Sequence, residues 1–255
     1  MANRVDVLIQ PFTLRFSLHE DEIVYMVAGT AEMQLDRMEL LMGVDPSTQQ
    51  LFDSNVGFLP VSTSTLIRGE KTIVVDPGNH HVGFYGPLKK SLSRFDLTPD
   101  DVDLVICTHA HGDHMSSISI FPGTDFMIGE KELPRDDSEE IIDPVMRAQV
   151  GTMGKVTEVP YDGELKVIDG VTAISTPGHS PGHISVLVDC GDERVAIAGD
   201  VVMFRREFDQ QEFGHWYSDE QRRLLNAGVE KIKAWGPTKV LPGHDRAFPA
   251  GEGRS

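Results

Sequence analysis

Four side chains of the types that bind metal ions lie within six consecutive positions, residues 109–114. They are His109, His111, Asp113 and His114. Imidazole and carboxylate groups hold zinc or iron at neutral pH. Ionisable groups packed this densely after a buried strand would repel or desolvate one another unless a cation compensated them. The run therefore predicts a metal site rather than a polar loop that happens to contain histidines.

Three further residues of ligand type follow apolar, strand-like segments later in the chain. Each comes directly after a glycine, and they are His179, Asp200 and His244. Taken alone, each would be interpreted as an ordinary turn residue. Together with the first run, they indicate that several strand ends converge on one edge of the fold and bring these side chains together.

The elements that must position these residues are mostly strands. Apolar and β-branched runs predict strands, and helical spacing of apolar residues predicts helices. Predicted strands cover residues 5–9, 14–18, 62–67, 71–75, 102–107, 126–129, 171–175, 184–188, 194–198 and 239–242, and predicted helices cover residues 31–42, 88–95 and 219–235. Two packed sheets with helices outside fit this order better than an alternating parallel sheet does.

The length of 255 residues fits a single domain, residues 1–255, without internal repeats. Between the predicted strands lies a polar, acidic and weakly patterned segment. We expect a helical insert there, at about residues 131–155, on the surface of the domain. The sequence leaves open whether this insert is a lid or a dimer contact, and whether the chain forms a homodimer.

The charge balance excludes some partners. The chain has 23 Lys and Arg against 40 Asp and Glu, a formal net charge of −17, which opposes binding to nucleic acid or to anionic lipid. Cys107 and Cys190 have no spacing typical of a disulfide framework or a redox motif. Residues 1–20 lack the continuous apolar run expected of a signal peptide, and no stretch reaches the roughly 18 apolar residues of a membrane span. We therefore expect a cytoplasmic protein.

The combined pattern His-x-His-x-Asp-His, then His, Asp and His, resembles the metallo-β-lactamase fold superfamily. The intervals are 65 residues from His114 to His179, 21 to Asp200 and 44 to His244. The resemblance runs from about Ser64 to Asp245 and implies a four-layer αββα sandwich with a dinuclear metal site. It is more specific for the fold and the metals than for the substrate, because this scaffold hosts many reactions.

The implied site holds two divalent ions, zinc in the first place, with iron or manganese as alternatives. One ion would be bound by His109, His111 and His179, the other by Asp113, His114 and His244, with Asp200 bridging the two. A hydroxide between the ions would be the nucleophile. Asp113 could also accept a proton or orient this nucleophile, while Asp76 and His183 would support the ligands from behind.

The resemblance also narrows the reaction to hydrolysis of a small ester or lactone, or a related amide. True β-lactamases of this fold generally lack a bridging aspartate. Residues 175–183 resemble the corresponding segment of N-acyl-homoserine lactonases, although Met203 stands where those enzymes place a tyrosine. Two alternatives stay open, a thioester hydrolase similar to glyoxalase II and a mono-iron oxidoreductase similar to persulfide dioxygenases.

A set of apolar and aromatic residues provides candidate walls for a substrate pocket. The set is Met115, Met203, Phe204, Phe208, His215, Trp216 and Tyr217. An aromatic-rich mouth would suit a small acyl or aromatic molecule. For each residue alone, ordinary core packing is the competing interpretation.

Overall fold

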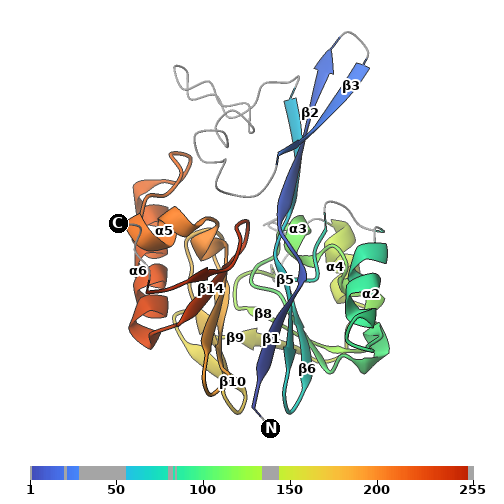
Figure 1. Ribbon diagram of the computed structural model, residues 1–255, viewed down its shortest axis with the longest axis vertical. Helices are drawn as coiled ribbons and strands as arrows, with labels where there is room; N and C mark the ends of the chain where they lie inside the picture. The colour runs from blue at the N-terminus through green and yellow to red at the C-terminus, as the bar shows by residue number, and fades with distance from the viewer. Residues whose placement is uncertain are drawn as a thin grey trace.

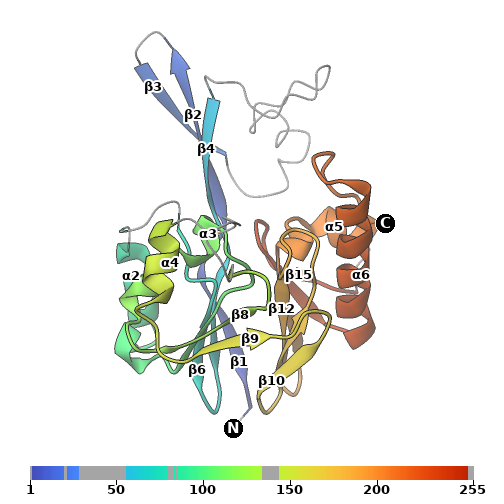
Figure 2. The ribbon, with the colours of Figure 1, turned by 180° about the vertical axis from the view of Figure 1, so that it is seen from behind.

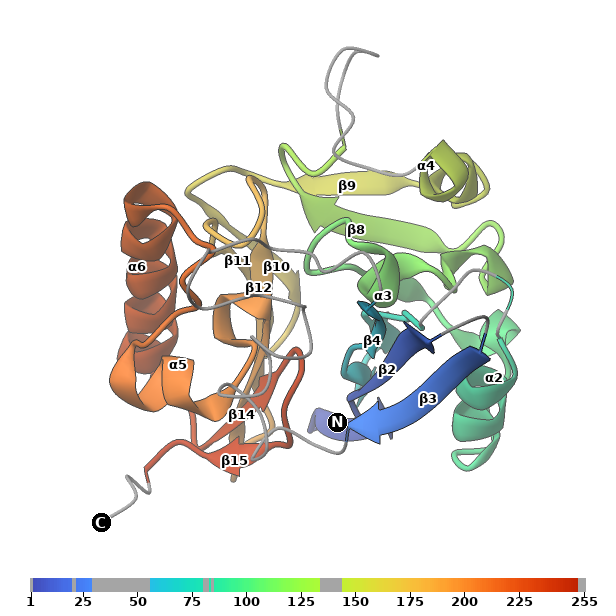
Figure 3. The same ribbon diagram turned by 90° about the horizontal axis from the view of Figure 1, so that it is seen from above.

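The computed structural model describes residues 2–19, 22–28, 56–79, 83, 85–133 and 144–251. Two six-stranded sheets face each other, and helices cover their outer faces (Figure 1). Seen from above, the order of layers is helix, sheet, sheet, helix (Figure 3). The predicted αββα sandwich is therefore confirmed.

The first sheet has the order β1-β5-β6-β7-β8-β9. Its strands are β1 (Arg4–Ile9), β5 (Ser64–Arg68), β6 (Thr72–Val75), β7 (Leu104–Ile106), β8 (Asp125–Gly129) and β9 (Val156–Val159). The strands β5 and β6 form the predicted antiparallel hairpin, and β6, β7, β8 and β9 run parallel to one another. The helices α2 (Gly86–Ser93), α3 (Gly112–Met115) and α4 (Pro144–Val150) lie on this side of the sandwich (Figure 2).

The second sheet has the order β10-β11-β12-β13-β14-β15. Its strands are β10 (Glu164–Ile168), β11 (Val171–Ser175), β12 (Ile184–Asp189), β13 (Arg194–Gly199), β14 (Lys239–Pro242) and β15 (Phe248–Pro249). The strands β11 and β13 are both antiparallel to β12, and β14 is parallel to β13. The strands β11, β13 and β14 therefore run in one direction. The helices α5 (Arg205–Gln210) and α6 (Asp219–Trp235) cover the outer face.

The helix α6 shows how local sequence fixes an element of the outer layer. The Ser218 side chain accepts a hydrogen bond from the Gln221 backbone N–H at its start, and Gly236 adopts the left-handed conformation that ends it. Leu225, Val229 and Ile232 recur at helical spacing and are fully buried. They belong to an apolar cluster that joins α6 to the second sheet, while a separate cluster fills the space between the two sheets.

A third, smaller sheet of three strands has the order β3-β2-β4 and projects beyond the sandwich (Figure 1). Its strands are β2 (Phe12–His19), β3 (Glu22–Ala28) and β4 (Val56–Val61), of which the sequence predicted only the first. The helix predicted over residues 31–42 lies outside the described residues. Of the predicted insert, α4 and the turns beside it are described, and residues 134–143 are not. Among the described helices, none is long and apolar enough to cross a membrane.

Candidate metal centre

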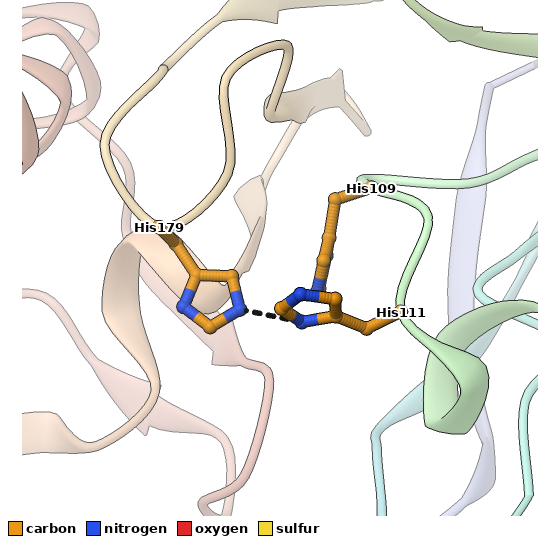
Figure 4. A group of neighbouring side chains, drawn as sticks. All are labelled: His109, His111 and His179. Atoms are coloured by element: carbon orange, nitrogen blue, oxygen red, sulfur yellow. Dashed lines mark hydrogen bonds between the residues drawn. The ribbon is translucent and has the colours of Figure 1, made fainter. Parts of the chain in front are cut away.

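The ligand-type residues lie where loops of the two sheets meet. The run 109–114 follows β7 in the first sheet, and His179, Asp200 and His244 follow the co-directional strands β11, β13 and β14 of the second. Because strands that point the same way end at the same edge, each sheet delivers its polar residues to one place. Figure 4 shows His109 and His111 from one sheet facing His179 from the other.

The first group of ligand-type atoms is formed by His109, His111 and His179, whose nitrogens lie within 4.8 Å of one another. The His111 Nδ1 and His179 Nε2 atoms are 2.9 Å apart. His109 is fully buried, whereas His111 is exposed, so the group has a buried back and an open front. Three convergent imidazoles with an open side are typical of a catalytic metal site.

The second group of ligand-type atoms is formed by Asp113, His114 and His244. The Asp113 Oδ2 atom lies 3.2 Å from His244 Nε2 and 3.7 Å from His114 Nε2. His114 and Asp113 come from the short helix α3, and His244 comes from the loop after β14. The second group therefore also joins both sheets.

Asp200 lies between the two groups. Its Oδ2 atom is 3.3 Å from His179 Nε2, 3.3 Å from His244 Nε2 and 4.0 Å from His109 Nε2, and its Oδ1 atom is 3.3 Å from His114 Nε2. One buried carboxylate thus faces imidazoles of both groups. This arrangement brings together all seven residues that the sequence singled out as ligands.

The residues fit bound metal ions. The atoms His109 Nε2, His114 Nε2 and Asp200 Oδ1 are buried, and none has a hydrogen-bond partner within the described part of the chain. Buried polar atoms without partners are rare because leaving them unpaired costs free energy. Divalent cations bound by imidazole and carboxylate would satisfy them.

The histidine pKa values differ between the two groups, being lowered at His109 and His179 in the first and raised at His244 in the second. Burial, and then the neighbouring His114, hold the pKa of His109 well below its usual range, and burial lowers the pKa of His179 to about 3. Both imidazoles are therefore neutral and free to bind a cation. Burial also lowers the pKa of His244, but the Asp200 and Asp113 carboxylates outweigh it and raise the pKa to about 10. A bound cation would take the place of that proton.

Asp76, predicted to support the site, contacts a ligand directly. Its Oδ2 atom lies 2.9 Å from His114 Nδ1 and accepts a hydrogen bond from Thr108 Oγ1, while Oδ1 accepts from the Thr108 N–H. The bond at Nδ1 leaves Nε2 of His114 to face Asp113 and Asp200. Asp76 adopts a φ of 51°, which aspartate tolerates better than most residues.

His183, the other predicted supporting residue, holds the backbone of Asp200. Its Nε2 atom accepts a hydrogen bond from the Asp200 N–H at 2.9 Å, and its Nδ1 atom lies 2.9 Å from Thr176 Oγ1. Burial keeps the pKa of His183 well below its usual range, in agreement with a neutral ring that accepts at Nε2. His183 therefore positions Asp200 rather than facing a substrate.

The candidate pocket residues fall into two sets. Met115 is fully buried in the apolar cluster on the α2 side, and Phe208 packs against Phe248 in the cluster under α6. Phe204 is buried too. The rings of His215 and Trp216 form an edge contact with each other.

Tyr217 and Met203 do reach the site. The Tyr217 hydroxyl lies 2.6 Å from His179 Nδ1 and donates a hydrogen bond to Met203 Sδ at 3.6 Å. The His179 Nδ1–H therefore donates to Tyr217, which leaves Nε2 free for a cation. The sequence placed Tyr217 in a pocket wall, and it gave no sign of this contact with a ligand.

Two buried glutamates near the site have no counterpart in the sequence analysis, namely Glu132 and Glu207. Glu132 follows the end of β8, the same kind of position as the ligands, and this position was the available signal. Glu207 lies in α5, where its Oε2 atom accepts hydrogen bonds from the N–H groups of Met203 and Phe204. Its Oε1 atom is buried without a hydrogen-bond partner in the described chain.

Replacing Glu207 with glutamine should flatten the pH dependence of stability. Burial raises the pKa of Glu207 to about 8 from an ordinary 4.5. The folded chain therefore keeps a proton that the unfolded chain releases between these values. Stability falls there as pH rises, by about 1.4 kcal/mol per pH unit. The neutral amide of Glu207→Gln removes this loss of stability, which denaturation midpoints at pH 5 and pH 8 would measure.

Glu220→Gln, at an exposed position of α6, is the control for this experiment. Parallel pH profiles for Glu207→Gln and the wild type would contradict the prediction.

Comparison with known proteins defines the family. Residues 57–244 match the family model of the metallo-beta-lactamase superfamily. The chain belongs to this superfamily. Its relatives imply a metal-dependent hydrolase, in agreement with the cluster of histidines and aspartates at the strand ends.

Individual members of the superfamily differ in how much of the chain they match. Metallo-beta-lactamase domain-containing protein 1 of Xenopus laevis is 30% identical over 191 residues, 72% of this chain and 70% of that protein. An N-acyl homoserine lactonase of Bacillus thuringiensis is 30% identical over 103 residues, 38% of this chain and 37% of the lactonase. A solved N-acyl homoserine lactone hydrolase, with the product N-hexanoyl-L-homoserine at its catalytic metal centre, matches with a TM-score of 0.59 at 19% identity and covers 96% of this chain and 93% of that one.

Proposed function

We propose that this chain is a dinuclear metal-dependent hydrolase that cleaves a small ester or lactone, or a related amide. The observation that carries the proposal is the Asp200 carboxylate, which lies 3.3 Å from the imidazoles of His114, His179 and His244. A shared carboxylate between two groups of ligands suits a pair of cations a few ångströms apart. Nitrogen and oxygen donors favour zinc, with iron or manganese as alternatives.

The chemistry divides between the ions and the chain. When bound, the two ions would supply a hydroxide nucleophile near neutral pH and would polarise the scissile carbonyl. The chain holds its ligands in one tautomer through Asp76, behind His114, and Tyr217, behind His179. Asp113 is partly exposed, at 13% of its side chain, and we assign to it the task of orienting the nucleophile or taking its proton.

The choice of ester or lactone rests on the superfamily relatives and on the open front of the site. The lactonase of Bacillus thuringiensis and the structurally similar lactone hydrolase support a small-molecule substrate. His111 is the exposed member of the two groups, whereas His109 and His114 are buried, so a substrate would approach from the side of His111. Met203, in place of the tyrosine of the lactonases, is the reason that we propose a reaction class rather than one lactone.

The test of this function combines metal content with a substrate panel. Mass spectrometry of the native protein should give two metal ions per chain. Hydrolysis of lactones, esters and thioesters should then be measured with zinc, manganese, iron and cobalt, and we expect the first two classes to be preferred. One iron per chain with oxygen uptake would instead indicate the persulfide dioxygenase type, and preference for thioesters would indicate the glyoxalase II type.

Replacing Met203 with leucine should change substrate preference without changing metal content. The Met203 sulfur accepts a hydrogen bond from the Tyr217 hydroxyl, which in turn lies 2.6 Å from His179 Nδ1. Loss of this weak acceptor frees the hydroxyl to take a different partner, which affects what binds beside His179. The ratio of kcat/KM for a lactone and its open-chain ester measures the change. An unchanged ratio would mean that Met203 is only a packing residue.

A further inference from the structure

Glu132 makes contacts that no metal-ligand pattern accounts for. Its side chain is completely buried. The Oε2 atom accepts a hydrogen bond from the Ala110 N–H at 2.8 Å, and Oε1 accepts from Ser180 Oγ at 2.6 Å and from the Gly182 N–H at 2.7 Å. Three donors surround this buried carboxylate, as burial of a charge requires.

The three donors belong to two loops, which also carry the first group of ligands. Ala110 lies in the loop after β7 of the first sheet, and Ser180 and Gly182 lie in the loop after β11 of the second sheet. Ala110 stands between His109 and His111, and Ser180 follows His179 directly. Two of the partners of Glu132, Ala110 and Ser180, are therefore direct chain neighbours of the ligands of this group. Glu132 touches none of them itself, so any effect on a metal must act through the position of the loops.

The backbones around Glu132 approach closely, so the loops have little room to shift without breaking these bonds. A methyl group at Gly129 would overlap the carbonyl of Gly182, and one at Gly182 would lie 2.8 Å from the Glu132 nitrogen. A further bond, from the Ile184 N–H to the Thr108 carbonyl at 2.8 Å, joins the two sheets behind the ligands.

We propose that Glu132 is a positioning residue, which sets the separation between the loop 109–111 and the loop 179–182 and thereby the geometry of the first metal group. The inference rests on the proposed metal site and deepens it. Loss of Glu132 would weaken the binding of the ion held by the first group. Groups that orient ligands from behind typically change metal affinity 10- to 100-fold when they are removed.

The second group depends on other supports, which makes the effect of Glu132 selective. His114 is fixed by Asp76, and the His244 N–H donates to the carbonyl of Met203. Asp113 accepts at its backbone carbonyl from Ser62 Oγ. None of these bonds involves Glu132. A change at Glu132 should therefore weaken the first ion far more than the second.

The experiment replaces Glu132 with glutamine, which keeps the shape of the side chain. One oxygen becomes an N–H₂ group, which must face either the Ala110 N–H or the Gly182 N–H, so donor meets donor and one bond is lost. Metal-free protein would be titrated with zinc against a competing chelator. Anomalous diffraction at limiting zinc would then report the occupancy of each position.

We expect Glu132→Gln to bind the ion of the first group about 10- to 100-fold more weakly and to retain the ion of the second group. Ser180→Ala, which removes one of the three donors, should have a smaller effect in the same direction. Glu130→Gln is the matched control, because Glu130 lies two residues away and accepts from the Tyr161 N–H at an exposed position. This control should bind both ions as the wild type does.

Two results would overturn the inference. Glu132→Gln could bind both ions normally, or it could lose both equally together with a lower melting temperature, as a purely structural residue would. A wild type that takes up no metal would refute the proposed function instead. In that case, hydrogen exchange on the metal-free protein still decides the role of Glu132. Faster exchange of the Ala110 and Gly182 amides in Glu132→Gln would support it, and unchanged exchange would refute it.

Discussion

Replacing Asp200 with alanine should reduce the metal content to at most one ion per chain and abolish nearly all hydrolysis. The Asp200 carboxylate faces His114, His179 and His244 at 3.3 Å each, so its loss removes the contact shared by the two ligand groups. Removing a shared ligand costs more than removing a supporting residue, for which 10- to 100-fold is typical. We therefore expect at least about a 100-fold loss of activity.

The sandwich itself should survive this change. Asp200 contributes no side chain to the three apolar clusters, and its backbone N–H keeps its bond to His183. Circular dichroism and the melting temperature of the metal-free protein would check the fold. Asp162→Asn is the control, because it removes the negative charge of a surface pair with Lys231 and asparagine tolerates the φ of 57° at this position. An Asp200→Ala protein that keeps two ions and full activity would refute the bridged site.

Where the signal is local, the sequence predicted which ligand-type side chains lie close together. His109, His111, Asp113 and His114 stand within six positions, and no packing knowledge is needed to recognise such a density of ligand types. The later ligands were found because each follows an apolar run and a glycine. Parallel or co-directional strands place such ends at one edge, so the approach of His179 to His111 follows from the topology.

The fold was predicted less completely where strands are short or lie outside the sandwich. The strand β15 has only two residues, too few for a period to be recognised, and β9 has the polar residues Thr157 and Glu158 between its two valines and so lacks an apolar run. The strands β3 and β4 were missed for another reason. The strand β3 follows β2 after Glu20-Asp21, which is not a typical hairpin turn sequence. The strand β4 also pairs with β2, and 36 residues separate His19 at the end of β2 from Val56 at the start of β4. Pairing at that distance depends on tertiary context.

The supporting contacts could not be predicted because nothing local encodes them. Glu132 bonds to Gly182 across 50 residues, and Tyr217 reaches His179 across 38. A single glutamate or tyrosine in a sequence has many ordinary roles. The sequence likewise could not predict which apolar cluster Met115 and Phe208 join, because their apolar character fits a pocket wall and a core equally well.

Replacing Gly243 with alanine should displace Asp200 and cost both metal binding and activity. Gly243 lies between β14 and His244, and its N–H donates to the carbonyls of Gly199 and Val202 at 3.1 Å each. A methyl group at this position would overlap the Oδ1 atom of Asp200. Because the backbone bonds hold Gly243 in place, the carboxylate must move, and it would then leave the imidazoles that it faces.

The expected result for Gly243→Ala is a loss of zinc affinity and of kcat of the same order as for Asp200→Ala, with the secondary structure retained. Gly86→Ala is the control, because a methyl group there would have no neighbour within 4 Å and alanine favours a helix. Zinc content, circular dichroism and hydrolysis of the preferred ester or lactone would be measured on both variants. If Gly243→Ala binds two ions and retains its activity, Asp200 does not need its observed position, and the bridging role assigned to it fails as well. A loss of metal binding in Gly243→Ala with an unchanged fold would instead show that the position of Asp200 depends on Gly243. The space that glycine leaves free is what allows the Asp200 carboxylate to face both groups.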